Sequence, residues 1–94
     1  MPHARCFYFA TLFLTLSAPM AQAQYRDMSC GDLYYERNSI YKNNGFCFKT
    51  ARAIQTFGNA GCSYDDVNDV PLSSRDRRKV ACIKEAEVDQ GCPR

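Results

Sequence analysis

The sequence predicts an all-α fold, a small disulfide-stapled domain of two long helices and one short helix with little or no strand. Apolar residues recur at helical spacing in three segments, and no long run alternates as a strand does. A serine or threonine precedes each segment and a glycine follows it, as is typical of helix ends. Five cysteines follow position 23, a density at which small exported domains are normally cross-linked.

Residues 1–23 are predicted to be a secretory signal peptide. Arg5 supplies the positive charge, residues 6–16 are mostly apolar, and Ala21-Gln22-Ala23 offers the small residues of a cleavage site. The apolar run is shorter than the about 20 residues that a membrane-spanning helix needs. We therefore expect cleavage between Ala23 and Gln24, which leaves one domain over residues 24–94 and no transmembrane segment.

The charge balance excludes some classes of partner. The whole chain carries a net charge of +2, and loss of Arg5 with the leader leaves eleven basic and ten acidic residues, or +1. A domain that binds nucleic acid or an anionic membrane normally carries a pronounced basic excess. We therefore expect no nucleic-acid partner.

The first long helix is expected over about residues 30–43, after a polar segment at 24–28 that we expect to be frayed. Ser29 and Asp32 have the spacing of a capping box at its start. Residues at three-to-four spacing mark its buried face: Leu33, Arg37, Ile40 and Tyr41.

Gly45 is expected to end this helix in the left-handed conformation of a C-cap. Phe46 lies just beyond the glycine and can fold back on Tyr41. Residues 46–48 then return to the core as a short extended segment, with Cys47 pointing away from the two phenylalanine rings.

Two further helices are predicted. Thr50 is expected to cap a short helix at 51–57, which Gly58 ends. Ser73 is expected to cap a long last helix at 74–90, whose buried stripe includes three residues: Val80, Ile83 and Glu87. The acidic loop between them, at 64–71, lacks the spacing, the glycine and the distal glutamate of an EF-hand, so we expect it to be solvated and without calcium.

The positions of the cysteines favour one disulfide pattern, although sequence alone does not decide the pairing. Cys30 opens the first long helix and Cys92 follows the last, so the two meet if these helices pack antiparallel. Cys47 and Cys62 bracket the short helix and are the second candidate pair. Cys82 is left as the candidate free thiol, either buried and inert or joined to a second copy in a dimer.

Arg37 lies on the apolar face of its helix, where a guanidinium needs a carboxylate partner. Glu87 lies on the apolar stripe of the last helix and is the natural choice. We predict a structural Arg37–Glu87 ion pair between the long helices. The alternative is that Arg37 binds an anion.

Enzymatic activity is not expected. The one histidine, His3, lies in the predicted leader, so residues 24–94 contain no Ser-His or Cys-His arrangement. The cysteines form no Cys-x-x-Cys pair, and we expect neither a metal nor another cofactor. A thiol-dependent redox protein or enzyme acting through Cys82 is the alternative. Among the aromatic residues, Tyr35 falls outside the buried stripe and is the candidate contact for a partner.

The stretch at 33–48 resembles the signature of the YARHG domain family, which is named for a Tyr-Ala-Arg-His-Gly run preceded by an Arg-Asn-x-Ile pattern. Here Arg37-Asn38-Ser39-Ile40 precedes Tyr41-Lys42-Asn43-Asn44-Gly45, so Tyr41 and Gly45 match and the three residues between them differ. The resemblance covers about residues 30–92. It implies an extracellular bacterial domain of unknown molecular function, and the missing histidine favours a structural role for Tyr41 and Gly45.

Together these observations predict a non-catalytic interaction module in the envelope of a Gram-negative bacterium, periplasmic or secreted. Its partner would be an envelope protein or a cell-wall glycan. A secreted effector or inhibitor is a further alternative.

Overall fold

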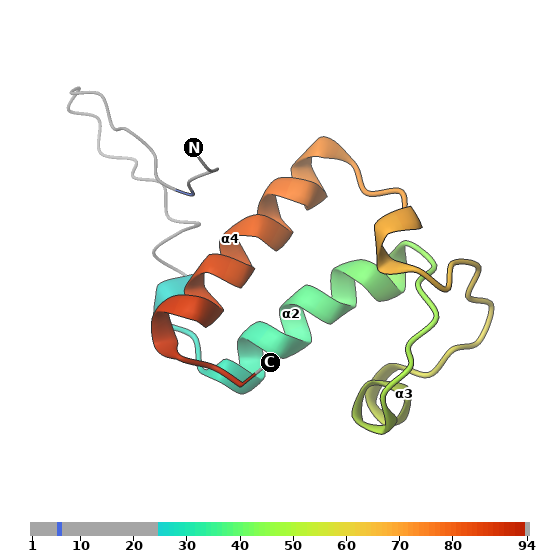
Figure 1. Ribbon diagram of the computed structural model, residues 1–94, viewed down its shortest axis with the longest axis horizontal. Coiled ribbons are helices and arrows are strands. Elements are labelled where there is room, and N and C mark those ends of the chain that lie inside the picture. The colour runs from blue at the N-terminus through green and yellow to red at the C-terminus, as the bar shows by residue number, and fades with distance from the viewer. Residues whose placement is uncertain (1–5, 7–24, 94) are drawn as a thin grey trace.

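A computed structural model describes Cys6 and residues 25–93 of the chain. Two long helices, α2 (Cys30–Asn43) and α4 (Ser74–Gln90), lie side by side and run in opposite directions (Figure 1). The short α3 (Ala51–Phe57) and a 3-10 turn, η1 (Val67–Asp69), belong to the connection between them. The described residues form no sheet, so the predicted all-α fold is confirmed together with the bounds of its three helices.

Each helix begins at the hydroxyl side chain that the sequence indicates. Ser29 Oγ accepts a hydrogen bond from the Asp32 amide at 3.1 Å, and Ser73 Oγ accepts one from the Asp76 amide at 3.0 Å. Thr50 Oγ1 accepts from the Ala53 amide at 3.1 Å. These bonds satisfy amides that have no partner within the first turn of a helix.

The end of α2 is a Schellman motif. The Gly45 amide donates to Lys42 O at 3.2 Å, and the Phe46 amide donates to Tyr41 O at 3.1 Å. Gly45 has a φ of 92°, in the region that favours glycine. The ring centroids of Tyr41 and Phe46 are 5.8 Å apart, which is the apolar contact that accompanies this motif.

The chain after Gly45 is held by the segment that follows α3. Gly45 O accepts hydrogen bonds from the Ser63 and Tyr64 amides at 2.8 and 2.9 Å, and a parallel bridge pairs Phe46 with Tyr64. A disulfide joins Cys47 to Cys62, as the sequence favours. The segments before and after α3 are therefore joined to each other, by hydrogen bonds at Gly45 and by the Cys47–Cys62 disulfide.

Two hydrophobic clusters form the core. The first lies between the start of α2 and the end of α4 and contains four buried residues: Tyr25, Leu33, Ile83 and Ala86. The second lies between the end of α2, α3 and the start of α4: Tyr41, Phe48, Ala53 and Val80. Ile40 packs against both clusters.

The segment before α2 is not frayed as the sequence predicts, and this correction has a clear cause. Tyr25 is 8% exposed and covers the cluster at Leu33 and Ile83. Gln90 Nε2 donates to Met28 O at 2.9 Å and fastens the segment to the end of α4. The local sequence is polar, but one aromatic ring gains a buried site from tertiary packing.

The predicted signal peptide lies outside the described residues except for Cys6. The predicted cleavage between Ala23 and Gln24 therefore stays a prediction.

Replacing Gly45 by alanine should destabilise the fold by about 1–3 kcal/mol, because alanine is strained at a positive φ. An added Cβ would also lie 3.2 Å from Cδ2 of the Tyr64 ring. Urea unfolding of the oxidised chain measures the effect.

Two glycines provide controls. Gly91 has a φ of 71° but nothing within 4 Å of its Cβ position, so Gly91→Ala should cost less than Gly45→Ala. Gly31 lies in a helix with no positive φ, and Gly31→Ala should be neutral or stabilising. Equal losses at Gly45 and Gly91 would show that the Tyr64 contact is irrelevant.

Candidate functional site

The predicted ion pair joins the two long helices in a two-point contact. Arg37 Nε donates to Glu87 Oε1 at 2.8 Å, and Arg37 Nη2 donates to Glu87 Oε2 at 2.9 Å. The two side chains are only 21% and 12% exposed. The planar guanidinium matches both carboxylate oxygens, a geometry that lysine does not offer.

This pairing bears on the two roles expected for Arg37, a structural one and anion binding. The hydrogen bond with Glu87 raises the pKa of Arg37 above its ordinary value and outweighs the opposing effect of burial. Because the guanidinium is neutralised on the side that faces α4, the arrangement favours the structural role over binding of an external anion.

A groove of about 260 Å³ lies over the ion pair. Its lining comes from α2, α4 and the C-terminal segment: Arg37, Lys84, Glu87, Val88, Cys92 and Pro93. Lys84 is exposed at its rim, and Val88 is 65% exposed. Glu87 is the one carboxylate in the described lining, and both of its oxygens are bonded to Arg37.

Five aromatic rings form a continuous row from the core to the surface, which we call the aromatic row: Tyr41, Phe46, Phe48, Phe57 and Tyr35. Successive ring centroids are 5.8, 5.1, 5.1 and 5.1 Å apart. Phe48 is 4% exposed, whereas Tyr35 at the other end is 55% exposed. Each contact lies in the range where aromatic pairs attract beyond simple burial.

The exposed end of the row forms the Tyr35 surface, which we define as Tyr35, Ile54 and Phe57. Ile54 is 41% exposed and lies one turn before Phe57 on the same face of α3. Between the same two helices, the Arg52 guanidinium lies 3.7 Å from the centroid of the ring of Tyr34, the residue before Tyr35, in a close cation–π contact. The surface is therefore apolar, rigid and bordered by a positive charge.

The cysteines are paired throughout the described chain. Cys30 is joined to Cys92, with their Cα atoms 5.5 Å apart, as the antiparallel helices predict. Cys82 is joined to Cys6, with a Cα separation of 5.2 Å. For the full chain the free-thiol prediction for Cys82 is therefore wrong, because the leader contributes a sixth cysteine. It stays a prediction for the chain without its leader.

Two further features, a metal site and a membrane-spanning helix, are not expected from the sequence. No group of three histidine, cysteine or acidic side chains suited to a metal occurs among residues 25–93 and Cys6. Within the same residues, no helix is long and apolar enough to cross a membrane.

A family model, described as the YARHG domain, matches residues 9–88. The chain belongs to the YARHG domain family. Neither the curated proteins nor the solved structures contain a match to it. The matched region starts before the predicted cleavage point and ends before Cys92, so the expected boundaries of 24–94 stay a prediction. Disulfides and a YARHG domain are consistent with an extracytoplasmic protein.

The structure explains which parts of the naming motif this YARHG domain keeps. Tyr41 occupies the third position before the helix cap and supplies the ring that meets Phe46. Gly45 supplies the positive φ. Of the three residues between them, Asn43 is exposed and Asn44 bonds through its own side chain to Ile40 O at 2.7 Å. The Schellman geometry needs the two ends of the run and tolerates other residues in its middle.

Sequence reasoning missed two polar contacts of the YARHG domain. The Asn59 side chain accepts from the Phe48 amide at 2.6 Å and donates to Phe48 O at 3.0 Å, in place of a neighbouring strand. Asn59 follows Gly58, a turn position where asparagine commonly bonds backbone, so a signal was present. The contact between Arg52 and Tyr34 had no comparable signal, because it depends on the packing angle of α3 against α2.

Breaking the ion pair should destabilise the YARHG domain by about 2 kcal/mol, between the values of exposed and fully buried pairs. Arg37→Glu and Glu87→Arg should each lose this stability, and the charge-reversed double variant should recover part of it. Thermal unfolding at neutral pH measures all three variants.

The exposed pair of Lys49 and Asp65 provides the control. Their charged atoms are 3.9 Å apart and the side chains are 55% and 85% exposed, so Lys49→Ala should change stability by less than about 1 kcal/mol. No recovery in the double variant would contradict the ion pair as a stabilising contact.

Alkaline pH should destabilise the domain through buried tyrosines. Burial raises the pKa of Tyr41 and also that of Tyr25 above their ordinary values. The folded state therefore disfavours the phenolate, so this stability is fully present below a pH of about 10 and is lost as pH rises through the folded pKa values. Circular dichroism of wild type and Tyr41→Phe across this range tests it; superimposable profiles would refute the role of Tyr41.

Proposed function

We propose that this YARHG domain is a non-catalytic interaction module of the Gram-negative cell envelope, which binds a partner protein through the Tyr35 surface. The observation that carries the proposal is the 55% exposure of a tyrosine ring that is nevertheless fixed against Phe57.

The chemistry of the domain supports a binding role over a catalytic one. Residues 24–94 contain no histidine, so neither a serine nor a cysteine has an imidazole to activate it. Glu87, which lines the larger groove, is committed to Arg37 through both carboxylate oxygens. Such an occupied carboxylate is a poor general base, because proton transfer would break the ion pair.

The Tyr35 surface has the composition of a protein-binding hot spot. Interface cores are enriched in tyrosine, phenylalanine and arginine, and rigid anchors lose little conformational entropy on binding. Tyr35 is held by Phe57, which in turn stacks on the buried Phe48. The ring is therefore placed before any partner arrives.

A protein partner suits this surface better than a cell-wall glycan does. Sugar recognition needs polar side chains placed around the aromatic ring to bond the hydroxyl groups. The ring in contact with Tyr35 is Phe57, and Ile54 lies one turn before Phe57 on α3, so both members of the surface add apolar area. Arg52 at the border favours an acidic rim on the partner.

The covalent framework supports the proposed compartment. A domain of this size buries too little apolar surface to rely on its core alone. Cys30–Cys92 and Cys47–Cys62 persist only where thiols are kept oxidised, as in the periplasm or the medium.

Affinity capture from an envelope extract tests the proposal, with the oxidised chain as bait. Tyr35→Ala should weaken capture of a specific protein at least tenfold, since hot-spot truncations cost about 2 kcal/mol or more. Val88→Ala is the matched control, because Val88 is an apolar residue on α4 that is even more exposed than Tyr35, at 65% against 55%.

Three outcomes would contradict the proposal. These are equal capture by wild type and Tyr35→Ala, loss of capture in Val88→Ala alone, and sedimentation with purified peptidoglycan that depends on Tyr35. The last would assign the surface to a glycan.

A further inference from the structure

We propose that, once the leader is removed, two copies of the chain associate through antiparallel α4 helices and are joined by a Cys82–Cys82 disulfide. The partner is a second copy of this chain, and the contact surface is distinct from the Tyr35 surface.

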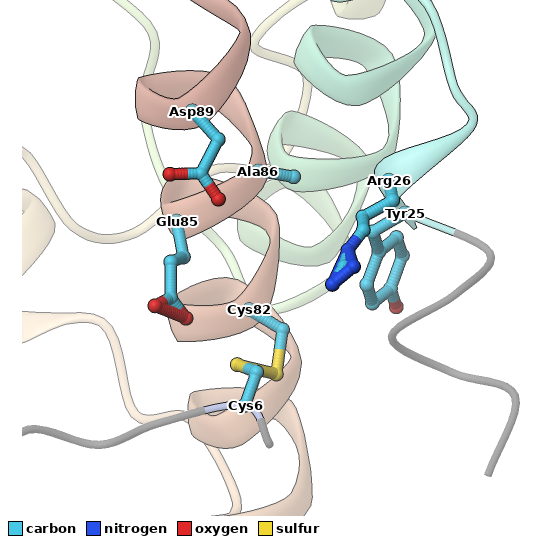
Figure 2. A pocket seen from close by; sticks show the side chains of 7 residues that line it. All are labelled: Cys6, Tyr25, Arg26, Cys82, Glu85, Ala86 and Asp89. Atoms are coloured by element: carbon cyan, nitrogen blue, oxygen red, sulfur yellow. A yellow bond between two sulfur atoms is a disulfide. The ribbon is translucent and has the colours of Figure 1, made fainter.

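The residues concerned form one stripe along α4, which we call the Cys82 stripe: Arg75, Arg78, Cys82, Glu85 and Asp89. Their spacing of three and four residues places them on one side of the helix. Figure 2 shows Cys82, Glu85 and Asp89 around one small pocket, with Tyr25 and Arg26 on its far wall. This side borders the core: Cys82 packs on the edge of the first cluster, while the buried residues of α4 are Val80, Ile83 and Ala86.

The charges of the Cys82 stripe are segregated about the cysteine. Arg75 and Arg78 precede Cys82 by seven and four residues, whereas Glu85 and Asp89 follow it by three and seven. When two such helices lie antiparallel with Cys82 on the two-fold axis, Arg75 of each copy faces Asp89 of the other at about 10 Å from the axis. Arg78 then faces Glu85. The stripe is therefore complementary to itself.

Within a single chain the same arrangement is unfavourable. Arg75 stands in the first turn of α4 and Asp89 in the last, so each opposes the helix dipole. Glu85 and Asp89 are also like charges four residues apart. Among residues 25–93, neither of these carboxylates nor Arg75 or Arg78 takes part in an ion pair. Arg26 lines the same pocket as the two carboxylates but forms no ion pair with them, and a partner helix would provide opposite charges in direct contact.

The side of α4 at Cys82 admits a second thiol. The Cα atoms of Cys6 and Cys82 are 5.2 Å apart, within the range of a disulfide, so a chain segment fits against the helix there. A leader cleaved after Ala23 before the Cys6–Cys82 disulfide forms, or released from Cys82 afterwards by thiol–disulfide exchange, leaves this position available to another chain. A second copy brings its own Cys82 to the same place.

The covalent step balances with a disulfide oxidant. Two Cys82 thiols lose two protons and form one sulfur–sulfur bond, and the electron pair reduces the disulfide of a thiol–disulfide oxidant to two thiols. Such oxidants maintain disulfides in the bacterial periplasm. Antiparallel docking by the charged residues would hold the two sulfurs together for this exchange.

Expression of the full chain with its leader in a Gram-negative host tests the proposal. Periplasmic protein, alkylated on lysis to block exchange, should run as a dimer on a non-reducing gel and as a monomer after reduction. Cys82→Ser should be monomeric, and Cys6→Ser should dimerise as wild type does. Peptide mapping of Cys30–Cys92 and Cys47–Cys62 confirms that each variant has folded.

The charge variants separate docking from chance oxidation. In a glutathione redox buffer, Arg75→Glu with Arg78→Glu should lower the dimer-to-monomer ratio about tenfold, through like-charge repulsion. Adding Glu85→Arg and Asp89→Arg restores self-complementarity and should restore the dimer. Arg77→Glu with Lys84→Glu changes charges on another side of α4 and should have no effect.

Two results would overturn the proposal. One is a processed monomer whose Cys82 reacts as a free thiol or carries another group. The other is a dimer ratio that the stripe variants and the control variants change equally.

Discussion

The contact between α2 and α4 is the interaction on which the rest of the domain depends. Leu33 and Ile83 are fully buried against each other's helices, and Arg37 and Glu87 close the same seam with two hydrogen bonds. This contact brings Cys30 and Cys92 within disulfide range. Apolar burial supplies the attraction between the helices, while the ion pair and the disulfide select their register.

The second half of the domain takes its position from the end of α2. The Schellman motif at Gly45 reverses the direction of the chain. Phe46 and Phe48 then pack in sequence along the aromatic row, so the motif fixes where the later rings lie. The location of Tyr35 relative to α3 is therefore set by buried contacts several residues away. A motif that begins as a helix stop thus supports the surface that we assign to binding.

Much of the fold could be predicted from sequence because its signals are local. Hydroxyl caps, glycine stops and helical periodicity act over a few residues, and they gave the bounds of α2, α3 and α4. The Arg37–Glu87 pair was also predictable, because a charge on an apolar stripe has few possible partners. Tyr25 and the Arg52–Tyr34 contact were not, since each depends on how separate segments pack. The bond of Cys82 to Cys6 was missed because the leader was treated as absent from the folded chain.

The two hydrophobic clusters each have their own disulfide, and this division has a consequence for local opening. Cys92 packs on the first cluster, and Cys47–Cys62 closes the connection around the second, while Ile40 is shared. The segment around α3 can therefore unfold locally while the contact between α2 and α4 stays intact. Its amide hydrogens would then exchange with solvent at a lower free energy of opening than those of α2 and α4. A partner bound at Tyr35 would stabilise this segment against local unfolding. Binding would therefore slow amide hydrogen exchange in α3 but not in the second half of α4.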